Sequence, residues 1–129
     1  MTEQKIQEAL AKYLDSLGVL WTATANGGLR AKSVAAALKK SGVKAGVPDI
    51  FIFSPPPSGV GVGLAIELKR PRQGKKPKGR VSDHQRIWLE SLRANGWRAE
   101  VAFGYDHALE ILTAAGYEKK TKSMKENTK

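Results

Sequence analysis

The segment "GVPDIFIFSPPPSGVGVGLAIELKR", from Gly46 to Arg70, decides which fold the chain adopts. Residues 49–53, "DIFIF", and residues 63–69, "GLAIELK", are too apolar for half-exposed strands and indicate strands buried on both faces. The stretch between them is rich in proline and glycine, which is typical of a turn. The two strands are therefore predicted to form a hairpin.

This apolar hairpin also contains two carboxylates and a lysine. A turn centred on Ser58 and Gly59 sets Asp49 opposite Lys69 or its neighbours, beside Glu67. Because side chains alternate along a strand, one face is expected to carry Ala65, Glu67 and Lys69, and the other Leu64, Ile66 and Leu68. The charged face is the candidate functional site.

Elements on both sides of the hairpin complete an α/β fold. Hydrophobic periodicity, caps and glycine stops predict three helices, over residues 2–17, 82–96 and 106–116, the last with Asp106 as its N-cap. A brief helical turn is predicted over 31–42, and further strands over 19–28, ending in a turn at Asn26 and Gly27, and over 97–104. This order gives a mixed sheet flanked by helices.

The length and net charge of the chain indicate its number of domains and the kind of partner that it binds. Its 129 residues suit one compact domain, and 22 Lys and Arg against 12 Asp and Glu give a formal net charge of +10, which favours a polyanionic partner. Residues 69–80 hold seven basic residues and no acid, and residues 119–129 add five lysines. We expect one folded domain over residues 1–117 and a basic, disordered tail over residues 118–129.

Composition and the N-terminal residues exclude several classes of protein. No apolar run approaches the roughly 20 residues that a membrane span needs. The absence of cysteine excludes disulfides, thiolate zinc sites and a cysteine nucleophile. The N-terminal stretch lacks the basic start and apolar core of a secretory signal, so a cytoplasmic location is expected.

Asp49 and Glu67 together indicate a metal site. Two carboxylates brought close together repel unless a cation lies between them, and hard oxygen ligands suit Mg²⁺ or Mn²⁺. Lys69 would then position or deprotonate the attacking water and offset charge on a phosphate. The implied reaction is phosphodiester hydrolysis, and the basic stretch downstream would attract a nucleic-acid backbone. The alternative is a structural Glu67–Lys69 ion pair beside a turn aspartate.

A family resemblance rests on these residues and their surroundings. Pro48-Asp49 followed by Glu67-Leu68-Lys69 resembles the signature of the PD-(D/E)XK nuclease superfamily. Six further stretches, which together span residues 3–112, resemble the VRR-NUC branch of that superfamily. They are "EQKIQ", "NGG", "LKKSGVKAGVPDIFIF", "GLAIELKR", "VSDHQRIWLESLRANGWRAEVAFG" and "DHALEIL". The resemblance implies a restriction-endonuclease-like αβββαβ core and a metal-dependent endonuclease acting on DNA, often of branched form.

The resemblance also implies roles for individual residues. Asp49, Glu67 and the carbonyl of Leu68 would hold the metal, and Lys69 would be the catalytic lysine. Gln85 matches the family's catalytic glutamine on the following helix, and Glu3 with Gln7 matches its first-helix acid and amide.

Two of these roles have alternatives. Gln85 could serve only in a capping box with Ser82. The first-helix acid could be Glu8, although a helical wheel places Glu3 about 40° from the centre of the apolar stripe and Glu8 roughly opposite it.

Partners follow from the charge and from the resemblance. The basic residues after Lys69 are expected to contact the DNA backbone without reading bases: Arg70, Arg72, Lys75, Lys76, Lys78 and Arg80. Two cuts in a four-way junction need two sites, so we expect a homodimer that acts on branched DNA. Its interface would lie on Ile111 and Leu112, on residues 97–104 or on the 54–63 turn.

Two rival functions stay open. One is a non-catalytic basic DNA-binding protein that keeps a nuclease-like fold, against which the complete set of Asp49, Glu67 and Lys69 argues. The other is an enzyme acting on RNA or nucleotides. The sequence has no aromatic platform of the RNA-binding kind, since its tryptophans are expected in the core or on helix faces.

Overall fold

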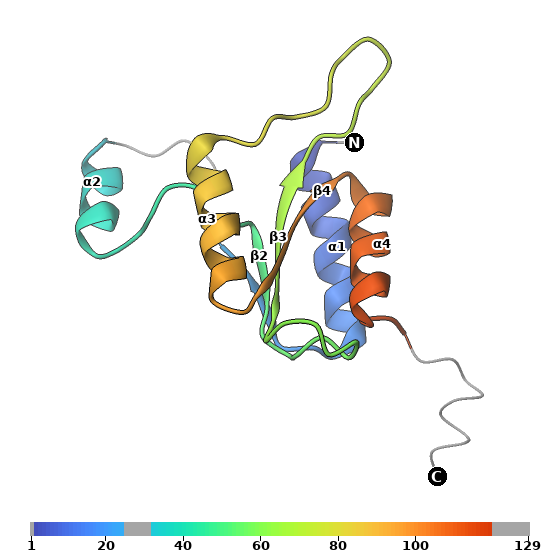
Figure 1. The fold of residues 1–129 in the computed structure, drawn as a ribbon. Helices are drawn as coiled ribbons and strands as arrows, with labels where there is room; N and C mark the ends of the chain where they lie inside the picture. Colours follow the sequence, from blue (N-terminus) through green and yellow to red (C-terminus); the bar gives the residue numbers. More distant parts are fainter. Residues whose placement is uncertain (1, 25–31, 120–129) are drawn as a thin grey trace, which may run out of the picture.

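The computed structural model describes residues 2–24 and 32–119, and within these ranges it contains four helices and four strands (Figure 1). They are α1 (Glu3–Leu17), β1 (Trp21–Ala23), α2 (Lys32–Lys40), β2 (Ile50–Ile52), β3 (Leu64–Lys69), α3 (Asp83–Ala94), β4 (Arg98–Phe103) and α4 (Tyr105–Ala115). The predicted order of elements is confirmed. The predicted turn at Asn26 and Gly27 and most of the predicted tail, residues 120–129, lie outside the described residues.

The strands form one mixed sheet in the order β1-β2-β3-β4. The first three strands are antiparallel neighbours, whereas β3 and β4 run parallel. The predicted mixed sheet is thereby confirmed. The hairpin register is shifted from the predicted one: Ile50 pairs with Ile66, which centres the turn on Ser58 alone. Extending that register by one residue brings Asp49 opposite Glu67 instead of Lys69.

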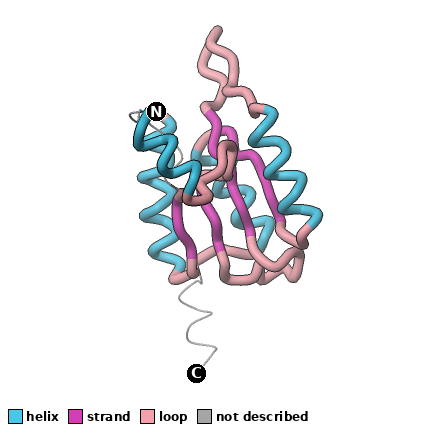
Figure 2. The backbone as a smooth tube through the Cα atoms, turned by 90° about the vertical axis from the view of Figure 1, so that its left-hand side faces the viewer, coloured by secondary structure: helices cyan, strands magenta, loops and turns pink. Residues whose placement is uncertain are grey.

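Helices cover both faces of the sheet (Figure 2). On one face, α1 and α4 pack over the side chains of Leu64, Ile66 and Leu68 in the larger core cluster. On the other face, Leu89 of α3 packs against Ala65 in a smaller cluster. The predicted alternation of the two faces of β3 is confirmed, and it leaves Glu67 on the face that α3 covers.

The helix boundaries follow from capping residues. The side chain of Thr2 accepts a hydrogen bond from the Lys5 N–H to begin α1, and Gly18, at a φ of 72°, ends it. Ser82 and Gln85 form a reciprocal capping box at the start of α3. The prediction for α4 was wrong by two residues, because its N-cap is Gly104 and Asp106 lies inside the first turn.

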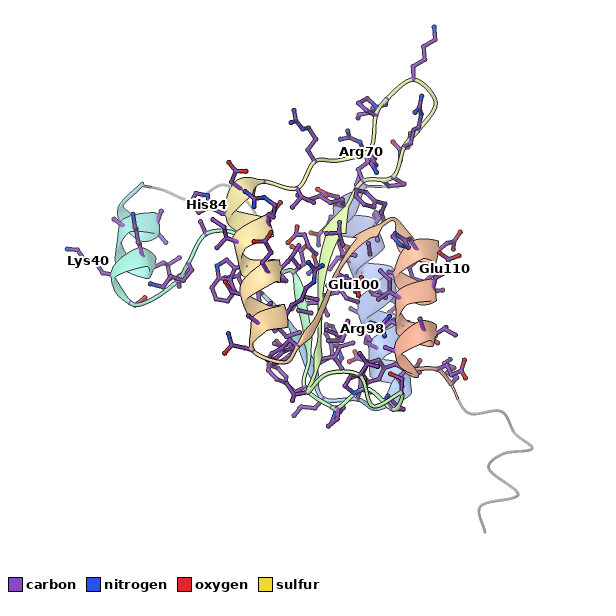
Figure 3. All side chains as sticks on the ribbon, in the orientation of Figure 1. Lys40, Arg70, His84, Arg98, Glu100 and Glu110 are labelled. Atoms are coloured by element: carbon purple, nitrogen blue, oxygen red, sulfur yellow. The ribbon has the colours of Figure 1, made fainter. Side chains whose placement is uncertain are left out.

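The second helix, α2, stands away from the body of the molecule, with Lys40 on it (Figure 3). Lysines lie in its last turn, and Val34 on it is half exposed. The sequence predicted only a brief helical turn here. None of the described helices is long and apolar enough to cross a membrane.

Candidate active site

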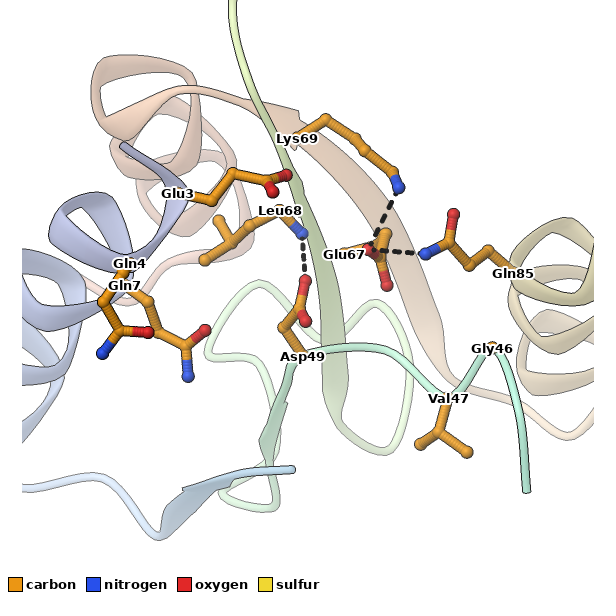
Figure 4. Close-up of a pocket in the computed structure, with 10 residues that line it drawn as sticks. All are labelled: Glu3, Gln4, Gln7, Gly46, Val47, Asp49, Glu67, Leu68, Lys69 and Gln85. Atoms are coloured by element: carbon orange, nitrogen blue, oxygen red, sulfur yellow. Dashed lines mark hydrogen bonds and ion pairs between the residues drawn. The ribbon is translucent and has the colours of Figure 1, made fainter. Parts of the chain in front are cut away.

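A pocket of about 380 Å³ lies where the C-terminal end of β3 meets the start of α1 and the start of α3 (Figure 4). The end of β3 contributes three consecutive residues, the approach to β2 contributes Asp49, and the first turn of α3 contributes Gln85. The complete lining is Glu3, Gln4, Gln7, Gly46, Val47, Asp49, Glu67, Leu68, Lys69 and Gln85. Every residue to which the resemblance gave a metal-binding or catalytic role therefore borders one pocket.

Glu67 lies at the centre of the polar contacts in this pocket. It is 3% exposed, and it is the buried charged residue of the described core. One carboxylate oxygen, Oε2, accepts a hydrogen bond from Gln85 Nε2 at 3.2 Å and lies 3.6 Å from Lys69 Nζ. The ammonium and the amide approach the carboxylate from the side of α3 (Figure 4).

Asp49 is fixed by the backbone of the neighbouring strand. Its Oδ2 accepts a hydrogen bond of 2.7 Å from the N–H of Leu68. The strand register, extended by two residues, would place Pro48 opposite Leu68, and proline has no N–H to donate to the carbonyl of Leu68 in the ladder. The Asp49 carboxylate accepts from the Leu68 N–H, the contact that the Pro48 carbonyl would make in a regular ladder, and the Leu68 carbonyl receives no N–H from Pro48.

The surroundings of Glu67 make its carboxyl group harder to ionise. Burial, followed by the negative charge of Asp49 and a hydrogen bond with its carboxyl group, raises the pKa of Glu67 from 4.5 to about 8, and the nearby ammonium of Lys69 opposes this shift. Two carboxylates this close repel each other, so the pair is stable only when one of them is protonated or when a cation lies between them. The donor set therefore fits a hard divalent cation.

The ligand set is small. Among the described residues, no three or more Asp, Glu, His or Cys side chains gather as a metal-binding group. Two carboxylates and one carbonyl are nevertheless consistent with Mg²⁺, which keeps several waters and completes its shell with substrate oxygens. Asp49, Glu67 and Leu68 all line the pocket and are the residues that would hold such an ion.

The raised pKa predicts a pH dependence for the stability of the metal-free protein. Between pH 4.5 and about 8, folded Glu67 keeps a proton that the unfolded chain has lost. The free energy of unfolding is therefore expected to fall as pH rises through this window and to level off above it. Thermal unfolding in EDTA, compared between the native chain and Glu67→Gln, measures the effect, and the same decline in both proteins would contradict it.

The structure separates the two candidate acids of the first helix. Glu3 lines the pocket, together with Gln7. Glu8 lies on the surface, where it accepts a hydrogen bond from Gln4 and lies 3.9 Å from Lys5 Nζ. The position of Glu3 at the pocket is the one that the helical wheel predicted, and its chemical role remains a proposal.

Gln85 makes both of the contacts that the sequence treated as alternatives. Its Oε1 accepts a hydrogen bond from the Ser82 N–H at 2.9 Å, and its Nε2 donates to Glu67. Because the capping box uses the oxygen, the nitrogen is the atom that faces the pocket. The cap thus sets the orientation of the amide as well as the start of α3.

Gln85→Glu is expected to separate these two contacts. Glutamate preserves the capping box but cannot donate to Glu67, and the loss of a hydrogen bond to a charged group should cost about 1.5–3 kcal/mol in the site. Cleavage, measured at a temperature where both proteins are fully folded, should fall about tenfold or more. Ser82→Ala is the matched control, since it removes the cap, at about 1 kcal/mol of stability, and keeps the donor. Equal cleavage by native and Gln85→Glu proteins would contradict a site role for the amide.

The predicted phosphate-binding residues lie outside the pocket, on a loop over residues 70–80 that follows β3. They are not equivalent. Arg70 donates to the carbonyl of Pro77 at 2.8 Å, and Lys78 Nζ lies 4.6 Å from the centre of the Phe103 ring. These two side chains hold the loop, and most of the loop's other residues are exposed.

Sequence reasoning missed three pocket residues. Gly46 and Val47 precede Asp49, and Gln4 lies one residue after Glu3. Gly46 has a φ of 84°, and a side chain there would overlap the backbone of His84. A glycine two residues before the Pro-Asp pair was the available signal for a close approach, whereas nothing in the sequence marked Gln4.

Comparison with known proteins agrees with this geometry. The family model described as "VRR-NUC domain" matches residues 1–106. The chain belongs to the VRR-NUC domain family. A solved structure described as "VRR_NUC domain protein" superposes with a TM-score of 0.68 at 24% identity, covering 88% of this chain and 86% of that one. The comparison with curated proteins gives no significant match.

The structural likeness shows that the VRR-NUC domain described here shares its fold with that protein. Its element order contains the αβββαβ core that the resemblance implied, with α2 inserted between β1 and β2. Family membership suggests a nuclease function.

Proposed function

We propose that this VRR-NUC domain is a Mg²⁺-dependent DNA endonuclease in which Mn²⁺ can substitute. The observation that carries the proposal is the convergence of Asp49 and Glu67 beside Lys69, with the Lys69 ammonium 3.6 Å from the Glu67 carboxylate, in a pocket open to solvent. A buried structural ion pair would account for Glu67 and Lys69. It would not account for a second carboxylate that raises the pKa of the first.

A bound Mg²⁺ would act as a Lewis acid on the scissile phosphate and would lower the pKa of the attacking water. Asp49, Glu67 and the carbonyl of Leu68 are the groups that would hold it. The hydrogen bond from the Leu68 N–H orients the Asp49 carboxylate, and the contact with Gln85 orients that of Glu67. Both acids are therefore positioned before substrate arrives, which reduces the reorganisation needed during reaction.

Lys69 supplies a positive charge beside Glu67. Its side chain is 12% exposed, so it borders solvent while lying against Glu67. As an ammonium it can donate a hydrogen bond that holds the attacking water and can offset the negative charge that develops on the phosphate. Only the neutral amine could accept the proton of that water. Glu3, at the opposite wall, is a further acceptor for a water molecule in the pocket.

The net charge of +10 and the basic residues after Lys69 support DNA as the substrate. Phosphate contacts from flexible lysines and arginines position a duplex without reading its sequence. We include in the proposal a preference for branched DNA, which the family resemblance suggests. A cytoplasmic location, expected from the N-terminal stretch, is also part of it.

A homodimer is the assembly that we propose, because the described part of each chain carries one pocket with this set of residues and a four-way junction needs two cuts. Two of the three candidate surfaces are less suited to the proposed dimer. Ile111 and Leu112 are 8% and 0% exposed, so α4 does not offer them to a partner. The 54–63 turn exposes Val60 and Val62 but lies at the far end of β3 from the pocket (Figure 1). The outer edge of β4 remains the surface for the proposed dimer.

One experiment tests the function. Labelled duplex, flap and four-way DNA are incubated with the protein in Mg²⁺, in Mn²⁺ and in excess EDTA, while light scattering reports its mass. We expect cleavage only with metal, faster cutting of the branched substrates and the mass of a dimer. Cutting in EDTA would overturn the metal mechanism. DNA binding without cutting in either metal would favour the non-catalytic DNA-binding alternative.

A further inference from the structure

The residues after Lys69 form a hairpin that extends beyond the end of β3 (Figures 1 and 2). Gln73 and Lys76 exchange two backbone hydrogen bonds, of 3.0 and 2.9 Å, and at the base of the loop the Gly79 N–H donates to the carbonyl of Arg70 at 2.8 Å. Gly74 has a φ of 59° at the first central position of the turn, the place that a type II′ turn favours for glycine. The loop is thus a narrow hairpin whose two extended arms are joined by backbone hydrogen bonds at the tip and at the base.

Contacts at its base fix this hairpin to the sheet. Pro71 lies against Gly104, where an added Cβ would come within 3.2 Å of its ring. Lys78 lies over the ring of Phe103 at the end of β4, and the Arg70 guanidinium donates to the carbonyl of Pro77. The ribbon therefore projects in a set direction from the ends of β3 and β4.

The returning arm of the hairpin passes over the side chain of Lys69. A Cβ added at Gly79 would lie 3.4 Å from both Cβ and Cδ of Lys69. Glycine at this position lets the arm approach the lysine that borders the pocket. A phosphate held at Lys69 would therefore have the hairpin directly beside it.

We propose, resting on the nuclease function above, that the hairpin of residues 70–80 enters the major groove of B-form DNA next to the phosphate in the pocket. The major groove is about 12 Å wide and admits a two-stranded ribbon, whereas the minor groove, about 6 Å wide, admits one only where the DNA is bent and the groove widened. Each arm advances three residues from its base pair to its tip pair, or about 10 Å at ~3.4 Å per residue. This reach is sufficient for a groove about 8.5 Å deep.

The chemistry of the tip agrees with insertion into a groove lined by phosphates. Arg72, Lys75 and Lys76 are exposed, and residues 72–76 include no apolar side chain that could wedge between bases. The ribbon would therefore bind an intact helix by charge and shape. The substrate must be duplex DNA at this side of the pocket. The major groove of A-form RNA is too narrow and deep for such a ribbon, so double-stranded RNA should be excluded.

The test measures binding of the full chain to a labelled duplex in EDTA, where no cleavage takes place. Three probes share one sequence: plain DNA, DNA with bulky groups on thymine C5, which fill the major groove, and double-stranded RNA. Plain DNA is also measured with a saturating netropsin-type ligand in the minor groove. We expect the C5 groups and the RNA backbone to weaken binding by about tenfold or more, and the minor-groove ligand to change it by less than about twofold.

A double variant, Lys75→Ala with Lys76→Ala, links the effect to the hairpin. It should reduce the salt slope of binding by about 2 and remove most of the protection of guanine N7 from methylation. Lys39→Ala with Lys40→Ala removes the same charge from α2 and should keep the protection. Competition by the minor-groove ligand, or equal affinity for the C5-modified duplex, would overturn the proposal. Because no readout requires cutting, this result is independent of whether the protein is a nuclease.

Discussion

Replacing Lys69 with alanine is expected to reduce DNA cleavage by about 10²–10⁴-fold, the range for the loss of a positioned proton-transfer group. Its Nζ is the cationic atom beside the buried Glu67 carboxylate, and no second ammonium lines the pocket in the described part of the chain. Asp49→Ala and Glu67→Ala should also abolish cleavage, because each removes a carboxylate that would hold the metal. Single-turnover cleavage in saturating Mg²⁺ measures all three.

These three substitutions should leave the fold intact. Glu67 is a buried acid with a pKa raised to about 8, so its removal relieves a desolvation cost instead of leaving a cavity in the apolar core. Asp49→Asn is the milder companion to Asp49→Ala, since an amide oxygen can still accept from the Leu68 N–H. Lys12→Ala, at an exposed lysine of α1, is the charge-matched control for Lys69→Ala. Undiminished cleavage by Lys69→Ala would overturn the proposed mechanism.

Gly46→Ala is expected to lower both stability and cleavage. A Cβ at this position would lie 2.5 Å from the backbone carbon of His84, and the φ of 84° is unfavourable for any L side chain. To relieve the overlap, the segment that carries Asp49 must move away from the start of α3, which carries Gln85. Positional errors of about 1 Å in such a site can cost about 10² in rate, and the backbone strain about 1–3 kcal/mol in stability.

Gly42→Ala is the matched control for this prediction. Gly42 also has a positive φ, of 106°, but an added Cβ would meet nothing within 4 Å. The control should therefore show only the conformational cost and should keep its cleavage rate. Chemical unfolding and single-turnover rates of both variants measure the difference. If Gly42→Ala and Gly46→Ala behaved alike, the contact with His84 would have no role in positioning the site.

Local sequence patterns were sufficient to predict most of the fold. Helical periodicity and the capping residues Ser82 and Gly18 depend on neighbours within one or two turns, so the chain itself specifies them. Strand alternation likewise placed Glu67 and Lys69 on one face of β3, because the side-chain period of a strand is fixed by the backbone. The αβββαβ order and the candidate acids follow from these local rules.

The tertiary structure decided how those residues meet. The register of β2 and β3 depends on the length and path of the 54–63 turn, so Asp49 came opposite Glu67 and not Lys69. The raised pKa of Glu67 depends on burial beneath α3 and on the approach of Asp49, and neither exists in an isolated strand. The two contacts of Gln85 became compatible only when α3 packed with its first turn over the end of β3. Contacts between residues distant in the sequence require a folded core to hold them, which is why the sequence named the residues of the site and only the structure arranged them.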